Sequence, residues 1–203
     1  MKKFIAGLML AAAAAFLAAP SQAADNPYEV ANSVATKTFG DLKANKDKLS
    51  DPSVVNGIIN SDLMPYVDVR YAAYKVIGPS LKETTKDERD QFTAAFGDYL
   101  MRSMSNAIGK YTNQELENSP VSQVSDSDNI VPVKYTVKTP GQADISFIIK
   151  MRLNRKTGEW KAFDLIAENV SILDSKQAEL SPIIKSKGIK AAITALEQNK
   201  AGK

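Results

Sequence analysis

The chain has 203 residues, a formal net charge of +3 at pH 7, and neither Cys nor His. Without Cys it has no disulfide, no thiolate chemistry, no metal–thiolate site and no lipid-modified N-terminal cysteine. Without His it lacks the side chain used most often in acid–base catalysis and metal binding, which leaves only a carboxylate-based or lysine-based enzyme open.

The first 23 residues predict a secretory signal peptide. Lys2 and Lys3 precede an apolar run from Phe4 to Ala19, and Ser21-Gln22-Ala23 supplies small residues for cleavage. A membrane anchor is the alternative, but the run is short and rich in Ala. Cleavage after Ala23 would leave one domain, 24–203, of 203 − 23 = 180 residues. Its charge would be 24 − 23 = +1, which gives no case for nucleic-acid binding. An export signal without a lipidated Cys predicts the periplasm.

Four helices are predicted before residue 112. Asn26-Pro27 begins the first, and Asp51-Pro52 begins a short second one that Met64-Pro65 interrupts. The third covers 66–78 and ends at Gly78-Pro79. Thr85 with Glu88 forms a capping box for a long helix whose apolar stripe is broad and aromatic.

The pattern then changes to a period of two residues. Strands are predicted at 131–138, 144–153 and 160–167, and residues 112–126 are ambiguous between an edge strand and a loop. The short turns between the strands require antiparallel pairing. In the strand 144–153 the large apolar side chains alternate, at Ile145, Phe147, Ile149, Met151 and Leu153. Either the protein's own helices or a ligand must cover that face.

Helices return after Asn169. Ser171 with Asp174 caps a helix that Pro182 kinks and Lys187-Gly188 ends, and Ile189–Leu196 forms a last helix. The order of elements predicts an α+β fold: an antiparallel sheet of about four strands, with helices from both ends of the chain packed on one face.

No motif for catalysis or for a metal stands out. The run Asp126-Ser127-Asp128-Asn129 resembles a calcium loop, but Ile130 occupies a ligand position, so a turn is favoured. Asp68 and Asp164 lie near aromatic clusters, where a helix cap, a backbone contact or an ion pair is favoured over acid–base work. Two loose basic groups offer a solvated surface, or a contact with acidic partners or anionic head groups: Lys82, Lys86, Lys185, Lys187 and Lys190.

The motifs in their order resemble the MlaC family of periplasmic lipid-binding proteins, which is also described as an auxiliary component of toluene-tolerance transporters. They are LMPYVDVRYAAYKVIG at 63–78, the QFTAAFGDYLMRSMSNAIGKY helix, TGEWKAFDLIAENVSIL at 157–173 and the KSKGIKAAITAL segment. Asn169 departs from the Gly that is common in relatives, and Asn tolerates a left-handed backbone nearly as well.

The resemblance implies a phospholipid carrier rather than an enzyme, with a lipid cavity between sheet and helices. It implies no cofactor, only bound phospholipid as cargo. The implied partners are an outer-membrane lipoprotein–porin complex and an inner-membrane ABC transporter with its membrane-anchored lipid-binding subunit. Such transport maintains the lipid asymmetry of the outer membrane. Two rival hypotheses remain: a periplasmic adaptor or chaperone, and a His-free enzyme of the isomerase or dehydratase kind.

The residues that line the cavity are predicted from the apolar pattern and not from the resemblance. The same aromatic side chains would also suffice for an ordinary closed core. The helical candidates are Tyr71, Tyr74, Phe96, Tyr99, Leu100 and Met104. The candidates in the sheet are Val133, Tyr135, Phe147, Ile149 and Met151, and Trp160 or Phe163 is expected to close one end.

Overall fold

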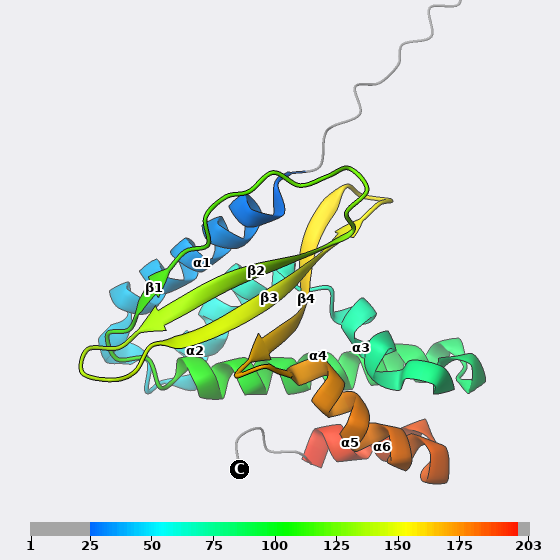
Figure 1. Ribbon diagram of the computed structural model, residues 1–203. Helices are drawn as coiled ribbons and strands as arrows, with labels where there is room; N and C mark the ends of the chain where they lie inside the picture. Colours follow the sequence, from blue (N-terminus) through cyan, green and yellow to red (C-terminus); the bar gives the residue numbers. More distant parts are fainter. Residues whose placement is uncertain (1–24, 199–203) are drawn as a thin grey trace, which may run out of the picture.

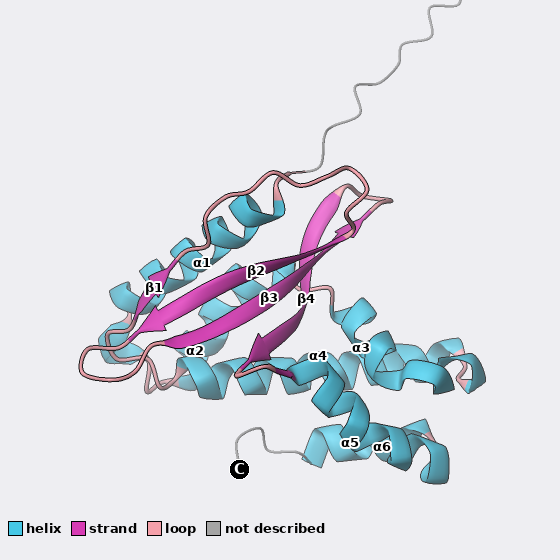
Figure 2. Ribbon diagram, viewed as in Figure 1, coloured by secondary structure: helices cyan, strands magenta, loops and turns pink. Residues whose placement is uncertain are grey.

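The computed structural model describes residues 25–198, so the predicted signal peptide at 1–23 lies outside the described residues. The fold is α+β, as the sequence predicts (Figures 1 and 2). One antiparallel sheet contains five strands in the order β1-β2-β3-β4-β5. The strands are β1 (Glu115–Glu117), β2 (Ile130–Lys138), β3 (Ile145–Asn154), β4 (Glu159–Ala167) and β5 (Val170–Ser171). The predicted count of about four is one too low, because the two-residue β5 has too few residues to show an alternating pattern.

The described residues also form six α-helices. They are α1 (Pro27–Ala44), α2 (Pro52–Ile58), α3 (Val69–Ile77), α4 (Lys86–Ile108), α5 (Ile172–Lys187) and α6 (Ile189–Gln198). A π-helical turn, Ile59–Leu63, and a 3₁₀ turn, Met64–Tyr66, continue from α2. Among the described helices, none combines the length and the apolar composition that a bilayer crossing requires.

The predicted helix caps are confirmed. Asn26 and Asp51 accept backbone hydrogen bonds at the starts of α1 and α2. Thr85 and Glu88 form the reciprocal capping box of α4, and the Ser171 hydroxyl accepts from the Asp174 N–H at the start of α5. Each cap satisfies amide groups that the helix itself leaves unpaired, so a few adjacent residues suffice to fix these starts.

The predicted start of the third helix at 66 is wrong, since α3 begins at Val69. Val67 is extended and pairs with Ala162 of β4, and the Asp68 N–H donates to the Ala162 carbonyl at 2.8 Å. Asp68 then caps α3 by accepting from the Tyr71 N–H. A contact with a strand almost a hundred residues away therefore delays the helix.

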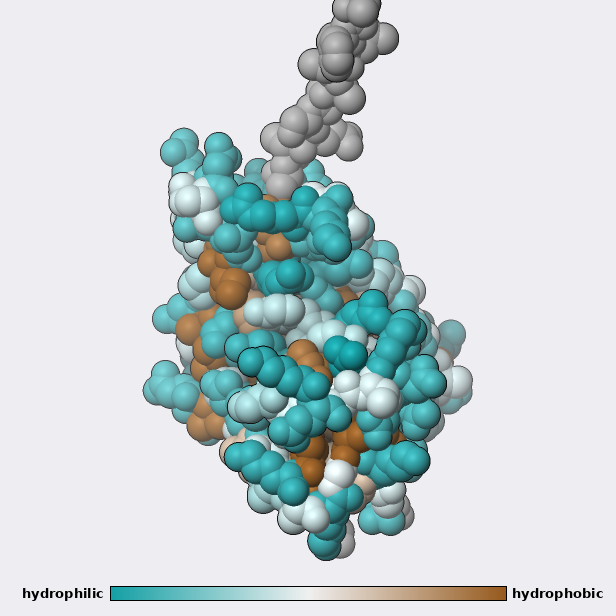
Figure 3. All heavy atoms as spheres, turned by 90° about the vertical axis from the view of Figure 1, so that its right-hand side faces the viewer, coloured by the Kyte–Doolittle hydropathy of each residue, from teal (hydrophilic) through white to brown (hydrophobic). Residues whose placement is uncertain are grey.

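The helices lie in two groups around the sheet. In Figure 1, α1 lies alongside β2 and roughly parallel to it, and none of the described helices lies in front of β2 and β3. α3, α5 and α6 form a bundle beyond the β4 side, and α4 runs from that bundle beneath the sheet towards α2. The bundle side of the surface is mostly hydrophilic, with a few separate apolar groups (Figure 3).

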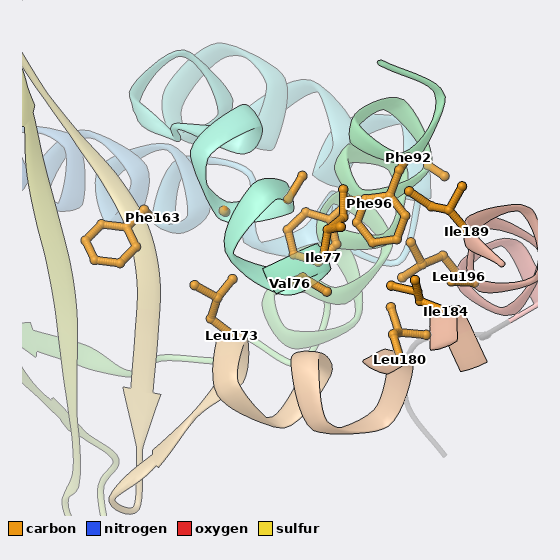
Figure 4. Packing of buried hydrophobic residues seen from close by; sticks show 14 residues of the cluster. Val76, Ile77, Phe92, Phe96, Phe163, Leu173, Leu180, Ile184, Ile189 and Leu196 are labelled. Atoms are coloured by element: carbon orange, nitrogen blue, oxygen red, sulfur yellow. The ribbon is translucent and has the colours of Figure 1, made fainter. Parts of the chain in front are cut away.

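The apolar interior consists of three separate clusters. The bundle cluster joins α3, α4, α5 and α6 with Phe163 of β4 (Figure 4). The sheet cluster joins α1 to one face of β2, β3 and β4. The α2 cluster joins α2 to the ends of α1 and α4. The buried side chains of the described residues are therefore divided among the layers and do not form one contiguous cluster.

Candidate functional site

One face of the sheet, here called the inner face, is apolar and turned towards α1. The register pairs Val131 with Met151, Val133 with Ile149 and Tyr135 with Phe147. All six residues belong to, or pack against, the sheet cluster, which also contains Ala31 of α1. The alternating residues of β3 therefore point inward, as the sequence pattern predicts, and α1 covers part of that face.

Burial of the inner-face side chains of β3 decreases from Met151 towards Ile145. On β3, Met151 is 2% exposed, Ile149 and Phe147 are half-buried, and Ile145 is 51% exposed. β4 and β5 repeat the trend, since Trp160 is 5% exposed and Val170 is 57% exposed. We call the end at Val131, Met151 and Trp160 the closed end. The open end consists of Val137, Ile145, Phe147, Ala167 and Val170.

The second half of α4 is also incompletely covered. Seven consecutive side chains from Tyr99 to Ser105 are all half-buried. A helix that packs on a single core has buried and exposed side chains alternating with its 3.6-residue period. This stretch has neither, so none of its sides is fully covered. Leu100 and Met104 contribute apolar atoms to it.

The structure divides the predicted site residues among the three clusters. The sheet candidates come together in the sheet cluster, where Val133, Tyr135, Met151 and Trp160 are buried and Phe147 and Ile149 are half-buried. The helical candidates Tyr71, Tyr74, Phe96, Tyr99 and Leu100 lie in the bundle cluster, and Met104 lies in the α2 cluster.

Trp160 and Phe163 do not lie together. Trp160 pairs with Leu153 and lies at the closed end. A β-bulge at Lys150/Met151 shifts the register of β4, and Phe163 packs in the bundle cluster, edge-on to Tyr71 with ring centroids 5.1 Å apart. Of the two residues, Trp160 lies at the end of the sheet, next to the hairpin 154–159, and that it closes a lipid cavity stays a prediction.

Several half-buried residues of the α2 cluster are absent from the sequence prediction. They are Val54, Leu63, Met64, Met101, Ile108 and Tyr111. Met101, Met104 and Ile108 recur at helical spacing, and this pattern could have identified them as one apolar face of α4. Methionine is flexible and polarizable, so it suits a wall that must fit contents of variable shape.

The polar groups of the inner face are internally satisfied. The Tyr135 hydroxyl donates to Asn32 Oδ1 of α1 at 3.0 Å, and its ring stacks on Phe147. Burial raises the pKa of Tyr135 far above its ordinary value, so the phenol stays neutral. The inner face therefore offers an apolar ligand no charge.

Asp68 and Asp164 have the structural roles that the sequence favours. Asp68 caps α3 and pairs with Arg152 at 2.8 Å. Asp164 accepts from the Ser171 hydroxyl and the Leu173 N–H, and Lys150 lies 3.2 Å from it. Each carboxylate is engaged with its own cation and helix start, so the arrangement does not form an acid–base pair.

We also searched residues 25–198 for metal sites and for recesses in the surface. No group of three or more acidic side chains there is arranged to hold a metal. A recess of about 630 Å³ between α4 and the segment of α2 and its π-helical turn is lined by both polar and apolar groups, among them Asn60, Met101 and Arg102. A second of about 210 Å³, near Tyr71 and Lys150, is on the other side of the sheet from α1. Neither recess is on the inner face.

Sequence comparison shows which known proteins the chain is similar to. Residues 32–198 match the family described as MlaC protein. The chain is 30% identical over 200 residues to the "Intermembrane phospholipid transport system binding protein MlaC" of Haemophilus influenzae, covering 98% of this chain and 94% of that protein. It is 27% identical over 152 residues to the "Toluene tolerance protein ttg2D" of Pseudomonas putida, covering 74% and 69% respectively.

A solved structure has the same fold. The phospholipid-binding protein of Ralstonia solanacearum, determined in complex with a phospholipid, superposes with a TM-score of 0.76 at 16% sequence identity. The superposition covers 87% of this chain and 98% of that one. At this identity the similarity establishes the architecture described above.

Proposed function

This chain belongs to the MlaC family, and from that premise we propose that it is a periplasmic phospholipid carrier and not an enzyme. The observation that carries the proposal is the inner face of the sheet, which is apolar throughout and changes from buried at Met151 to exposed at Ile145. In a closed core the neighbouring side chains would cover such an apolar strip completely. Acyl chains between the sheet and α4 would cover it and connect the three clusters.

The energetics favour a site of this kind. A buried methylene is worth about 0.8 kcal/mol relative to water, so two chains with roughly thirty methylenes would cost on the order of 24 kcal/mol to expose. A wall of aliphatic and aromatic side chains resembles the bilayer interior, so transfer between membrane and carrier is nearly neutral. Partners must then supply the direction of transport.

The proposed partners follow from the family. We propose that the carrier exchanges phospholipid with an outer-membrane lipoprotein–porin complex and with the lipid-binding subunit of an inner-membrane ABC transporter, which maintains outer-membrane lipid asymmetry. The predicted signal peptide and the absence of Cys support a periplasmic protein without a lipid anchor.

The direct test is native mass spectrometry, followed by solvent extraction, of the protein purified from its own periplasm. We expect nearly every protein molecule to carry one glycerophospholipid, and none to carry more than one. An extract without lipid would contradict the carrier and favour an adaptor, and turnover of a small substrate would favour an enzyme. The same sample should have the mass of residues 24–203 without an added acyl group.

We expect weak selectivity among head groups. The exposed residues at the open end, Ile145 and Val170, are apolar, and no cluster of charged side chains surrounds them on the inner face. Exchange from vesicles that contain equal amounts of zwitterionic and anionic phospholipid should load both to within a few-fold. A strong preference for one head group would show that a specific polar contact exists.

A further inference from the structure

We infer that the acyl chains lie lengthwise along β3, with the head group at the open end, and that Met151 and Trp160 at the closed end limit the length of chain the site accepts. This inference rests on the proposed function and adds the orientation of the cargo and a residue-level determinant of its length.

The first support is a match of lengths. From Ile145, half exposed, to Ile149, half-buried, the strand advances four residues, which is about 13 Å at the rise of a β-strand. One leaflet of a bilayer has a hydrocarbon thickness of about 15 Å, half of the usual core. The incompletely covered strip is therefore about as long as the acyl region of one phospholipid.

The second support is that the closed end is blocked. Val131, Met151 and Trp160 are buried against one another in the sheet cluster. Beyond them, the Leu153 N–H donates to the Asn129 carbonyl, and the strands end at the polar hairpin 154–159. A chain that moves inward from Ile145 therefore meets the packed side chains of Met151, Val131 and Trp160 directly after Ile149.

The third support excludes a crosswise orientation. A chain running towards β1 would have to cross Tyr135, which is fully buried and held by its hydrogen bond to Asn32 of α1. α1 covers that side of the inner face. The direction along β3 and β4 is the one in which burial decreases gradually.

The open end suits a head group in water. Ile145 follows an exposed polar turn that ends at Asp144, and Val170 follows the exposed Glu168 and Asn169. Apolar side chains at this border contact the first methylenes, while phosphate and head group remain solvated. No charge has to be buried, which is consistent with the neutral inner face.

The test uses vesicles with equal amounts of phosphatidylethanolamines carrying two C12, two C14, two C16 or two C18 chains. Delipidated protein is incubated with them and re-isolated, and its lipid is analysed by mass spectrometry. Three variants are compared with wild type: Ile149→Trp narrows the site near the closed end, Met151→Ala lengthens it, and Ile148→Trp is the matched control, on the same strand but on the outer face.

Wild type should take up the four phosphatidylethanolamines equally up to a limiting chain length. Above that limit, the amount of bound lipid should fall by about fourfold for each methylene that cannot enter the site. Ile149→Trp should move that limit to shorter chains and Met151→Ala to longer ones, while Ile148→Trp leaves the profile unchanged. If Ile149→Trp fails to fold, as seen by circular dichroism, the shift in Met151→Ala decides alone. A wild type that loads no phospholipid would refute the proposed function itself. Lipid-loaded Ile149→Trp and Met151→Ala proteins with the wild-type chain profile would overturn only this inference.

Discussion

Asp62 is the most unusual single residue of the described chain. Its side chain is fully buried in the π-helical turn Ile59–Leu63, one oxygen accepts from Lys37 Nζ and Ser61 Oγ, and the other has no hydrogen-bond partner. Burial opposes its ionisation, but the hydrogen bonds from Lys37 and Ser61 outweigh burial and hold the pKa of Asp62 below its usual value. The carboxylate therefore connects the turn after α2 to α1.

Asp62→Asn should lower the free energy of unfolding by about 1–3 kcal/mol at pH 7, because a charge-assisted bond to a buried group is lost. Since the folded-state pKa lies below the unfolded value of about 3.9, the stabilisation is complete above that pH and disappears as pH falls through the folded pKa. Urea unfolding at pH 7 and pH 3.5 should show the difference between wild type and variant shrinking at the lower pH.

Asp41 provides the control for Asp62. It pairs with the same lysine, Lys37, but its side chain is 44% exposed, and ion pairs that water reaches contribute little. Asp41→Asn should change the stability by less than about 0.5 kcal/mol. Equal effects of the two substitutions would mean that the burial of Asp62 contributes nothing.

At the scale of single elements, the turn between β4 and β5 contains residues that its backbone conformation does not favour. Glu168 and Asn169 both have positive φ, 51° and 64°, in a two-residue turn. Such turns favour Asn-Gly, because a side chain with positive φ is strained unless it is short and polar. The hairpin positions Val170 at the open end, so its conformation bears on the site.

Replacing Glu168 by Asn and Asn169 by Gly together should raise the free energy of unfolding by about 1 kcal/mol. Thermal and urea unfolding measure the change, and Glu168→Ala is the control, since it removes the charge but keeps the Cβ atom. A gain as large in the control would assign the effect to charge instead of backbone conformation.

The elements that the sequence predicted correctly are those fixed by neighbouring residues. The cap at Thr85 and Glu88 lies within four residues, and the alternation in 144–153 reflects one face of one strand. The start of α3 was mispredicted because Val67 pairs with distant Ala162. For the same reason the sequence left open whether Trp160 or Phe163 lies at the end of the sheet, because a bulge is set by the pairing of two strands and leaves no mark in the alternation.

At the scale of the whole molecule, the three clusters predict a dependence of stability on cargo. A ligand that binds only the folded state adds RT ln(1 + [L]/Kd) to stability, about 2.7 kcal/mol when its concentration is a hundred times Kd. Delipidated wild type should therefore melt several degrees below the loaded protein. Calorimetry of both forms, with the lipid content measured, is the test.

Phe147→Ala should reduce the difference between the two forms, because it removes part of the half-buried wall that cargo would contact. Val76→Ala is the control, since Val76 is fully buried in the bundle cluster and should lower both melting temperatures equally. The sequence could not show which residues of the bundle cluster and the α2 cluster would contact the cargo. The alternation in a strand reveals its two faces but not which helix lies over them.

The position of Trp160 provides a spectroscopic signal that requires no label. It is the only Trp of the chain, and it lies at the closed end, 5% exposed. Bromine atoms quench indole fluorescence at short range. A phospholipid brominated near its chain ends should therefore quench the Trp160 fluorescence, while one brominated near the glycerol should leave it unquenched. Stopped-flow mixing of loaded protein with brominated vesicles would then follow each exchange in real time, with the protein's own indole marking the arrival of the chain ends.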